Sequence, residues 1–344
     1  MEFNKYSVHK ILVIKPEAIG DVLLATPVIE NLRHNFPDAE INFLTRSYCA
    51  EVLTGNPFLN RVLTFDINSS GGDSSLCLIR NIHKQKYDLI IDLFGNPRTA
   101  IIVFNSDAKY RVGYRFKWRA LAYNIKIKPR GSIVHNIEFN LDSLRALGLE
   151  IITSKPSFYL NAVHTEFADD FFERNNLNNS PVIGMNPSGT WPTKVWPAAK
   201  FAELGRKLSS ENYKLLLFWG YGEEKTLAEK IQKEIGDSAL LIPETDIKYM
   251  GAIAKKCKLF ITNDTGPMHI AWVLGVNVAA IFGPTNPALQ GPLSENSLII
   301  RNEELSCLGC NLTKINDCPN DHKCMENLSV EYVYDKIIKS NILS

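Results

Sequence analysis

The chain has 344 residues, of which 45% are hydrophobic and 22% are charged, a composition typical of a globular protein with room for two domains. Its formal net charge of +1 gives no reason to expect nucleic-acid binding. The first apolar run is too short for a signal peptide, and the uncharged stretch at 270–294 is broken by glycine and proline. We therefore expect a cytoplasmic chain without a membrane-spanning helix.

Strand and helix patterns alternate through the first half of the chain. Short apolar runs predict strands at 10–15, 39–45, 60–66 and 87–94, and a further strand is expected at 109–114. Apolar residues at helical spacing predict helices over 19–36, 47–55, 75–85 and 133–149. The last of these ends near Gly148, a suitable helix C-cap.

The alternation begins again after a stretch at 150–180 that mixes turn residues with one short helix. Strands are predicted at 181–187, 213–220, 239–243, 258–263 and 276–283, and helices at 196–210, 224–236, 246–257 and 266–275. This order predicts βαβ units and parallel sheets. We expect an α/β chain of two doubly wound domains that face a cleft, residues 1–170 and 171–344. Ligands of such sheets bind beyond the carboxyl ends of the strands.

The first predicted strand ends in KPEAIGD, residues 15–21. Gly20 allows the backbone to approach a ligand closely, and Asp21 falls in the first turn of the next helix. Asp21 is either a carboxylate that the helix dipole stabilises or a general base that projects into the cleft. Lys15 and Gly20 are counted with it as candidates for contact with a bound ligand. The dinucleotide pattern G-x-G-x-x-G is absent here.

The first strand of the second half runs into MNPSGTWPTKVWP, residues 185–197. Ser188, Thr190 and Thr193 supply hydroxyl groups, and Lys194 supplies a cation. These groups in a strand-to-helix loop suit a phosphate or diphosphate. The alternative is a rigid loop whose lysine is solvated.

Two glutamates, Glu223 and Glu224, follow the strand at 213–220. One of them is a candidate for accepting hydrogen bonds from sugar or ribose hydroxyls. The alternative is that both simply occupy the first turn of the next helix.

The segment TNDTGPMH follows the strand at 258–263. Pro267 suits the first helical position, so Asp264, Thr265 and Gly266 lie at the cap, where free amides can face an anion. Asp264 would repel that anion, and we assign it to neutral hydroxyls of the same ligand. His269 lies one helical turn further on. The alternative is a plain helix cap with a core histidine.

A cysteine-rich tail occupies residues 307–324. Its spacing is C-x2-C-x7-C-x5-C, formed by Cys307, Cys310, Cys318 and Cys324. Four thiols in a cytosolic chain favour a structural zinc or iron site over disulfides. Disulfides and free thiols remain the alternatives.

The segment KYRVGYRFKWRA, residues 109–120, interleaves basic and aromatic side chains. Arg115, Lys117 and Arg119 suit an anionic lipid surface or a phosphorylated saccharide acceptor. No nucleic-acid-binding motif accompanies them, and the alternative is a strand with solvated charges.

Three blocks taken together resemble glycosyltransferase family nine, the ADP-heptose:lipopolysaccharide heptosyltransferases. They are ILVIKPEAIGDVLLATPVIENLRHNFPDAEINFLT, GMNPSGTWPTKVWPAAKFAEL and FITNDTGPMHIAWVLGVNVAAIFGPTNP. The resemblance covers residues 10 to about 330. It implies a GT-B fold of two Rossmann-like domains, with acceptor bound by the first and nucleotide-sugar donor by the second. It also implies inverting transfer of heptose from ADP-heptose to the lipopolysaccharide inner core, without a catalytic metal.

The resemblance also implies roles for particular residues. Asp21 matches the proposed base of a G-D motif, and Lys194 matches the lysine expected at the donor phosphates. Asp264, Thr265, Gly266 and His269 match a motif at the donor diphosphate and sugar, and Glu223 or Glu224 matches a glutamate of the nucleotide region. Such enzymes act on the cytoplasmic face of the inner membrane, and some relatives bind iron in a cysteine-rich tail. The alternatives are a heptosyltransferase of autotransporter proteins, a relative that uses another nucleotide-sugar, and a non-catalytic nucleotide-sugar-binding module.

Overall fold

The computed structural model describes residues 3–66, 75–131 and 133–343, which form two compact units, Met1–Tyr159 and Leu160–Ser344. The predicted boundary between residues 170 and 171 falls inside helix α7 (Ala162–Arg174), which belongs entirely to the second unit. This helix packs against α10 (Ile247–Lys255), where the rings of His164 and Phe167 meet Tyr249 edge-on. These aromatic contacts explain why the division comes before α7.

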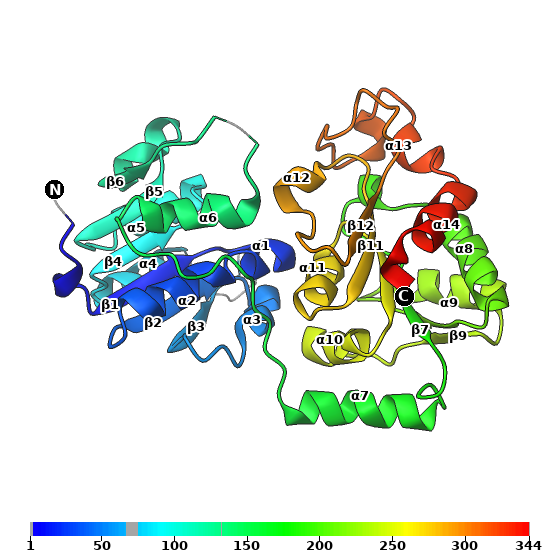
Figure 1. Ribbon diagram of the computed structural model, residues 1–344. Helices are drawn as coiled ribbons and strands as arrows, with labels where there is room; N and C mark the ends of the chain where they lie inside the picture. The colour runs from blue at the N-terminus through cyan, green and yellow to red at the C-terminus, as the bar shows by residue number, and fades with distance from the viewer. Residues whose placement is uncertain (1–2, 67–74, 132, 344) are drawn as a thin grey trace. The chain divides into compact units, whose positions relative to one another are not determined.

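The N-terminal unit is a parallel six-stranded sheet with the strand order β3-β2-β1-β4-β5-β6, drawn from blue to green in Figure 1. Its strands are β1 (Lys10–Ile14), β2 (Glu40–Thr45), β3 (Arg61–Thr64), β4 (Leu89–Asp92), β5 (Tyr110–Tyr114) and β6 (Ile125–Ile127). Its helices are α1 (Ile19–Leu23), α2 (Thr26–Asn35), α3 (Ser47–Leu53), α4 (Ser75–Lys84), α5 (Pro97–Phe104) and α6 (Asn136–Arg145), with short 3-10 helices η1 (Lys5–Ser7) and η2 (Lys117–Ala122).

The C-terminal unit repeats this design with the strand order β12-β11-β10-β7-β8-β9, drawn from green to red in Figure 1. Its strands are β7 (Val182–Asn186), β8 (Lys214–Leu217), β9 (Ala239–Leu241), β10 (Leu259–Asn263), β11 (Asn277–Ile281) and β12 (Ser297–Ile300). Besides α7 and α10, its helices are α8 (Ala198–Ser210), α9 (Glu223–Ile235), α11 (Gly266–Val273), α12 (Pro287–Gln290), α13 (Lys323–Glu326) and α14 (Val330–Lys339), with 3-10 helices at Pro192–Lys194, Ile315–Asp317 and Asn341–Leu343.

The central strands of both sheets are buried on both faces, as continuous apolar runs require. In β1, Ile11 to Ile14 have no exposed surface, and the same holds for Leu259 to Ile261 in β10. In each sheet the first strand lies beside the fourth strand of its unit, β1 beside β4 and β7 beside β10. Within each pair, the two strands lead to their next strands on opposite sides of the sheet. Each pair is therefore a topological switch point, where ligands of such sheets bind.

The predicted α/β fold of two Rossmann-like domains is confirmed, but several elements differ. The helix expected over 19–36 is divided into α1 and α2, because Pro27, in the first turn of α2, has no amide hydrogen with which to continue α1. Helix α5 was not predicted, although Asn96 caps its first turn by accepting from the Thr99 amide and Pro97 occupies its first position. Within the described ranges, the structure contains no helix long and apolar enough to cross a bilayer.

Candidate functional site

The carboxyl ends of β7 and β10 lie side by side, because Asn186 is in register with Thr262. The Asn186 side-chain amide donates to the hydroxyls of Thr262 and Thr265, at 3.3 and 3.1 Å. The Ser188 hydroxyl lies 3.2 Å from Asn186 Oδ1. Asn186 was not selected from the sequence, although a polar side chain at the end of a buried strand could have identified it. This asparagine fixes the two strand-end loops relative to each other.

The same network reaches one of the two candidate glutamates. Glu224 Oε2 accepts from the Gly220 amide at 2.8 Å and lies 2.9 Å from the Ser188 hydroxyl. Ser188 is buried, Glu224 is half-buried, and Glu223 is exposed. The geometry therefore joins Glu224 to the loop after β7, while Glu223 lies on the outer side of the first turn of α9.

A buried asparagine at the end of β10 holds the loop that follows β7. The Asn263 amide donates to the carbonyl oxygens of Pro187 and Ser188 at 3.0 and 3.2 Å, and Asn263 Oδ1 accepts from the Trp196 amide at 3.1 Å. Sequence reasoning did not single out this residue. Because backbone groups on both sides of Lys194 are tied to one side chain, the loop is closely constrained.

Lys194 forms an ion pair with Asp264, and Lys194 Nζ lies 2.8 Å from Asp264 Oδ2. The same oxygen accepts from the Thr285 hydroxyl at 2.7 Å and from the Gln290 side-chain amide at 2.6 Å. The ammonium also lies 4.4 Å from the centre of the Trp191 ring. Asp264 thus holds the lysine in place, a contact that the sequence did not indicate. Thr285 and Gln290 were also missed.

The remaining donor candidates lie at the start of α11 or in the loop after β7. Gly266 begins α11, and Thr265 is its N-cap residue. His269 is buried on α11, and Thr190 is exposed. Thr193 is buried, and its hydroxyl donates to the Leu312 carbonyl oxygen at 2.6 Å rather than facing an open site.

The cysteine-rich tail packs against the loop that carries Lys194. Besides the Thr193–Leu312 contact, the His322 ring nitrogen Nε2 lies 2.6 Å from the Thr193 carbonyl oxygen. The Asn311 amide donates to the Pro284 carbonyl oxygen at 2.7 Å, next to Thr285. The tail therefore supports both loops that meet at Asp264.

The structural zinc or iron expected at Cys307, Cys310, Cys318 and Cys324 is not supported. Within the described part of the chain, no three His, Cys, Asp or Glu side chains are grouped so that they could hold a metal ion. Cys310 is exposed, whereas Cys324 is buried in the core of the unit, and all four thiols are free. Burial, together with the neighbouring cysteines, raises the pKa of Cys324 to about 11, so this thiol is protonated at neutral pH.

The first strand end of the N-terminal unit carries Asp21 at the third position of α1. Its Oδ2 atom accepts from the Ala18 amide at 3.3 Å, and the side chain is half-buried. Lys15 is buried, and its ammonium donates to the Leu93 carbonyl oxygen at 3.3 Å. Gly20 is buried beside them in α1. In this structure Lys15 supports the loop after β4, and Asp21 caps its own helix while keeping part of its surface exposed.

Asp92 ends β4 at the same switch point and is fully buried. Its carboxylate accepts from the Phe94 and Gly95 amides at 3.0 and 2.9 Å, and from the Tyr123 hydroxyl at 2.7 Å. Burial raises the pKa of Asp92, and these hydrogen bonds oppose that shift. Sequence reasoning did not select Asp92, whose contacts shape the loop at 93–96.

The basic segment after β5 is partly exposed. Arg115 and Lys117 are exposed, and Arg119 is half-buried with its guanidinium donating to the Gly95 carbonyl oxygen at 2.7 Å. The Arg119 guanidinium also lies 5.4 Å from the centre of the Phe116 ring. The segment is therefore attached to the loop that Asp92 shapes.

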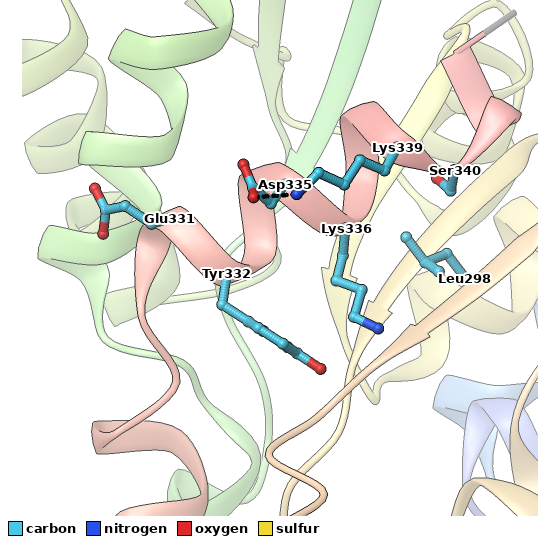
Figure 2. Close-up of a pocket in the computed structure, with 7 residues that line it drawn as sticks. All are labelled: Leu298, Glu331, Tyr332, Asp335, Lys336, Lys339 and Ser340. Atoms are coloured by element: carbon cyan, nitrogen blue, oxygen red, sulfur yellow. Dashed lines mark hydrogen bonds and ion pairs between the residues drawn. The ribbon is translucent and has the colours of Figure 1, made fainter.

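A hollow of about 580 Å³ lies elsewhere on the C-terminal unit, between α14 and the edge strand β12 (Figure 2). Its lining includes two acidic and two basic side chains, and Asp335 and Lys339 pair with each other. It includes none of the residues at the ends of β7 and β10.

Comparisons with solved structures show that the chain shares the GT-B fold. The glycosyl transferase family 9 structure from Veillonella parvula DSM 2008 superposes with a TM-score of 0.79 at 22% identity, covering 97% of each chain. The E. coli heptosyltransferase WaaC with ADP superposes with a TM-score of 0.75 at 18% identity, covering 96% of this chain and 99% of that one. These similarities establish the shared fold.

The sequence pattern of glycosyltransferase family 9 (heptosyltransferase) matches residues 76–318. The lipooligosaccharide heptosyltransferase 2 of Campylobacter jejuni subsp. jejuni serotype O:2 is 27% identical over 333 residues, covering 95% of this chain and 97% of the relative. The family match spans more than half of the chain. This protein therefore belongs to glycosyltransferase family 9, and it is a glycosyltransferase.

Proposed function

We propose that the protein transfers a heptose from ADP-heptose to the inner core of lipopolysaccharide, on a Kdo or heptose acceptor. Support comes from the family match and from relatives named lipopolysaccharide or lipooligosaccharide heptosyltransferases. The C-terminal unit, taken as residues 171–344 from the sequence or from Leu160 in the structure, would bind the donor. The N-terminal unit would bind the acceptor.

The observation that carries the proposal is the fixed ammonium beside the start of α11. An ammonium has three N–H donors, and the ion pair with Asp264 uses one of them. The first backbone amides of α11, at Gly266 and beyond, have no carbonyl partners within the helix and favour an anion. Together these groups would bind the diphosphate of the donor and stabilise the charge of the departing ADP.

The other donor candidates extend this assignment along the same strand ends. Ser188 and Glu224 form a hydrogen-bonded pair that would receive hydroxyls of the ribose or heptose. Thr265 and His269 lie on or beside the first turn of α11, where the sugar and diphosphate would meet. Asp264 acts in this proposal mainly by orienting Lys194, with Thr285 and Gln290 completing its hydrogen bonds.

Asp21 would act as the general base. An acceptor hydroxyl oxygen attacks the anomeric carbon of the heptose, its proton passes to the Asp21 carboxylate, and the bond from that carbon to the ADP oxygen breaks. The configuration at the anomeric carbon inverts in this single displacement. Asp21 lies at a carboxyl strand end and is half-buried, so it combines a fixed position with access to an acceptor.

The proposal places the enzyme at the cytoplasmic face of the inner membrane, where its lipid-linked acceptor would be found. Arg115, Lys117 and Arg119 would contact phosphorylated acceptor or anionic lipid. No catalytic metal is required, because Lys194 and the start of α11 supply the positive charge. The second candidate is heptose transfer to a protein acceptor.

The test uses the purified full chain with ADP-heptose and a soluble, deacylated inner-core oligosaccharide. We expect ADP release that depends on the acceptor, together with a product heavier by one heptose in mass spectrometry. Transfer only to a peptide acceptor would favour the protein heptosyltransferase, and turnover only with another nucleotide-sugar would change the donor. Donor binding without transfer or hydrolysis would indicate a binding module and would overturn the proposal.

A further inference from the structure

Two short helices of the N-terminal unit expose large apolar side chains. On α5, Ile101 and Phe104 are 46% and 61% exposed, and on η2, Trp118 and Leu121 are 57% and 74% exposed. Each pair is spaced by three residues, which places both members on one side of an α-helix and directly above each other on a 3-10 helix. Such spacing normally marks a face that packs against something apolar.

The two helices form one continuous region of the unit. They pack against each other, and their inward-facing residues Ala100, Val103 and Ala122 share one core cluster on the sheet. Helix α4, which packs beside α5, adds an exposed leucine, Leu76, at its first turn. Figure 1 shows α4 and α5 in this unit. The exposed apolar side chains therefore belong to elements that cover the same part of the sheet.

Positive charge is concentrated in this part of an otherwise balanced chain. The whole chain has 38 Lys and Arg residues against 37 Asp and Glu residues, whereas residues 93–137 contain nine Lys and Arg residues and one acidic residue, Asp107. That carboxylate pairs with Lys86 at 3.7 Å. Arg115 and Lys117, which precede the exposed Trp118, are both exposed. The charge is therefore directed outward beside the apolar side chains.

We propose that this surface docks on an anionic lipid membrane. The α5–η2 surface is defined as the exposed side chains of Ile101, Phe104, Trp118 and Leu121, together with Arg115 and Lys117. Apolar and aromatic side chains enter the boundary between headgroups and acyl chains, while cations remain at the lipid phosphates. A second copy of the chain is a poor occupant, because two surfaces of this charge repel each other. A nucleic acid would satisfy the cations but would leave the apolar side chains without apolar partners.

The inference deepens the proposed function, because a docked N-terminal unit would meet an acceptor that is anchored in lipid. The membrane contact itself can be measured without donor or acceptor. The result therefore does not depend on which sugar is transferred.

The test measures sedimentation of the full chain with vesicles of phosphatidylcholine, alone or mixed with phosphatidylglycerol. We expect binding to the mixed vesicles that falls with added salt, because screening weakens attraction to the charged surface. The apolar variant Phe104→Ser/Trp118→Ser/Leu121→Ser should bind the mixed vesicles at least about tenfold more weakly. The charge variant Arg115→Gln/Lys117→Gln should lose about fivefold per cation removed.

The matched control is Tyr6→Ser/Val163→Ser, which removes two side chains that are 90% and 57% exposed elsewhere. We expect it to bind like the unmodified protein. Thermal unfolding and ADP titration confirm that each variant is folded. Unchanged vesicle binding by the folded apolar variant would overturn the proposal. Tight binding to duplex DNA, retained by the apolar variant and stronger than vesicle binding, would replace lipid by nucleic acid and also overturn it.

Transfer to a soluble acceptor separates this proposal from the proposed function. The apolar variant should keep that activity, because its three side chains are exposed and take part in none of the hydrogen-bond networks described at the two strand-end sites. Loss of vesicle binding with full soluble transfer supports docking by this surface. If the unmodified protein binds vesicles but transfers no heptose, the docking surface stands and the proposed function fails.

Discussion

The two switch points share one sheet topology but carry different chemistry. At the ends of β7 and β10, the buried Asp264 carboxylate is matched by the Lys194 ammonium and by neutral donors. At the ends of β1 and β4, the buried Asp92 carboxylate accepts only neutral donors among the hydrogen bonds described above. Its neighbour Asp21 remains half-buried and makes one weak contact with the backbone.

Under the proposed function, this difference would correspond to a division of work between the two units. A cation and free helix amides suit the constant diphosphate of a donor, so the C-terminal site can be largely fixed before binding. A carboxylate that keeps solvent access suits a proton acceptor, whose partner differs from one acceptor to another. The paired lysine and the accessible aspartate should therefore respond differently to substitution.

The largest effect is expected from Asp21→Ala. Removing a general base lowers turnover by about 10²–10⁴-fold, while the C-terminal donor site is left intact. Steady-state transfer to a soluble acceptor gives turnover, and calorimetric titration with ADP gives donor affinity. Glu17→Gln is the matched control, because Glu17 is a neighbouring half-buried carboxylate whose side chain pairs with Arg46 at 3.4 Å. Full turnover in Asp21→Ala would remove this residue from the mechanism.

The next effect is expected from breaking the buried ion pair. Lys194→Met leaves Asp264 buried without its cation, and breaking such pairs costs about 3–5 kcal/mol of stability. We also expect ADP to bind at least about tenfold more weakly, because the diphosphate loses a charged donor. Urea unfolding and ADP titration measure the two effects.

A double-mutant cycle with Asp264→Asn sharpens this result. If Asp264 acts by holding Lys194, the double variant should lose less ADP affinity than the sum of the single losses. Lys200→Met is the control, since Lys200 is a second lysine of this unit that contacts the carbonyl of Leu328 at 3.0 Å. Strictly additive losses would mean that the two side chains act on the donor independently.

The fold followed from the sequence, because it depends on local patterns, whereas the position of the ligand site stays a prediction. Continuous apolar runs predicted the central strands, and polar residues at their ends predicted where a ligand would bind. The D-T-G-P segment correctly placed a helix start at Gly266. The edge strands β6 and β12 were not predicted, because each is short and only partly buried.

The contacts within the site could not be predicted in the same way. Lys194 and Asp264 are distant in sequence, and only the pairing of β7 with β10 brings their loops together. Thr285 belongs to a third loop, after β11, and reaches the same carboxylate. The cysteine spacing suggested a metal site, but Cys324 is buried in the core whereas Cys310 is exposed. Spacing along the chain carries no information about that difference in burial.

The smallest effect is expected from removing one hydroxyl donor at each switch point. Tyr123→Phe takes a donor from Asp92, and Thr285→Val takes one from Asp264. Losing a hydrogen bond to a charged group costs about 1.5–3 kcal/mol, and the cost should be greater at Asp92, because Lys194 still compensates Asp264. Urea unfolding of both variants measures the two costs, and amide hydrogen exchange at Phe94 and Gly95 should accelerate only in Tyr123→Phe. An equal or larger cost for Thr285→Val would show that the cation does not compensate, and the contrast between the two switch points would then rest on Asp21 alone.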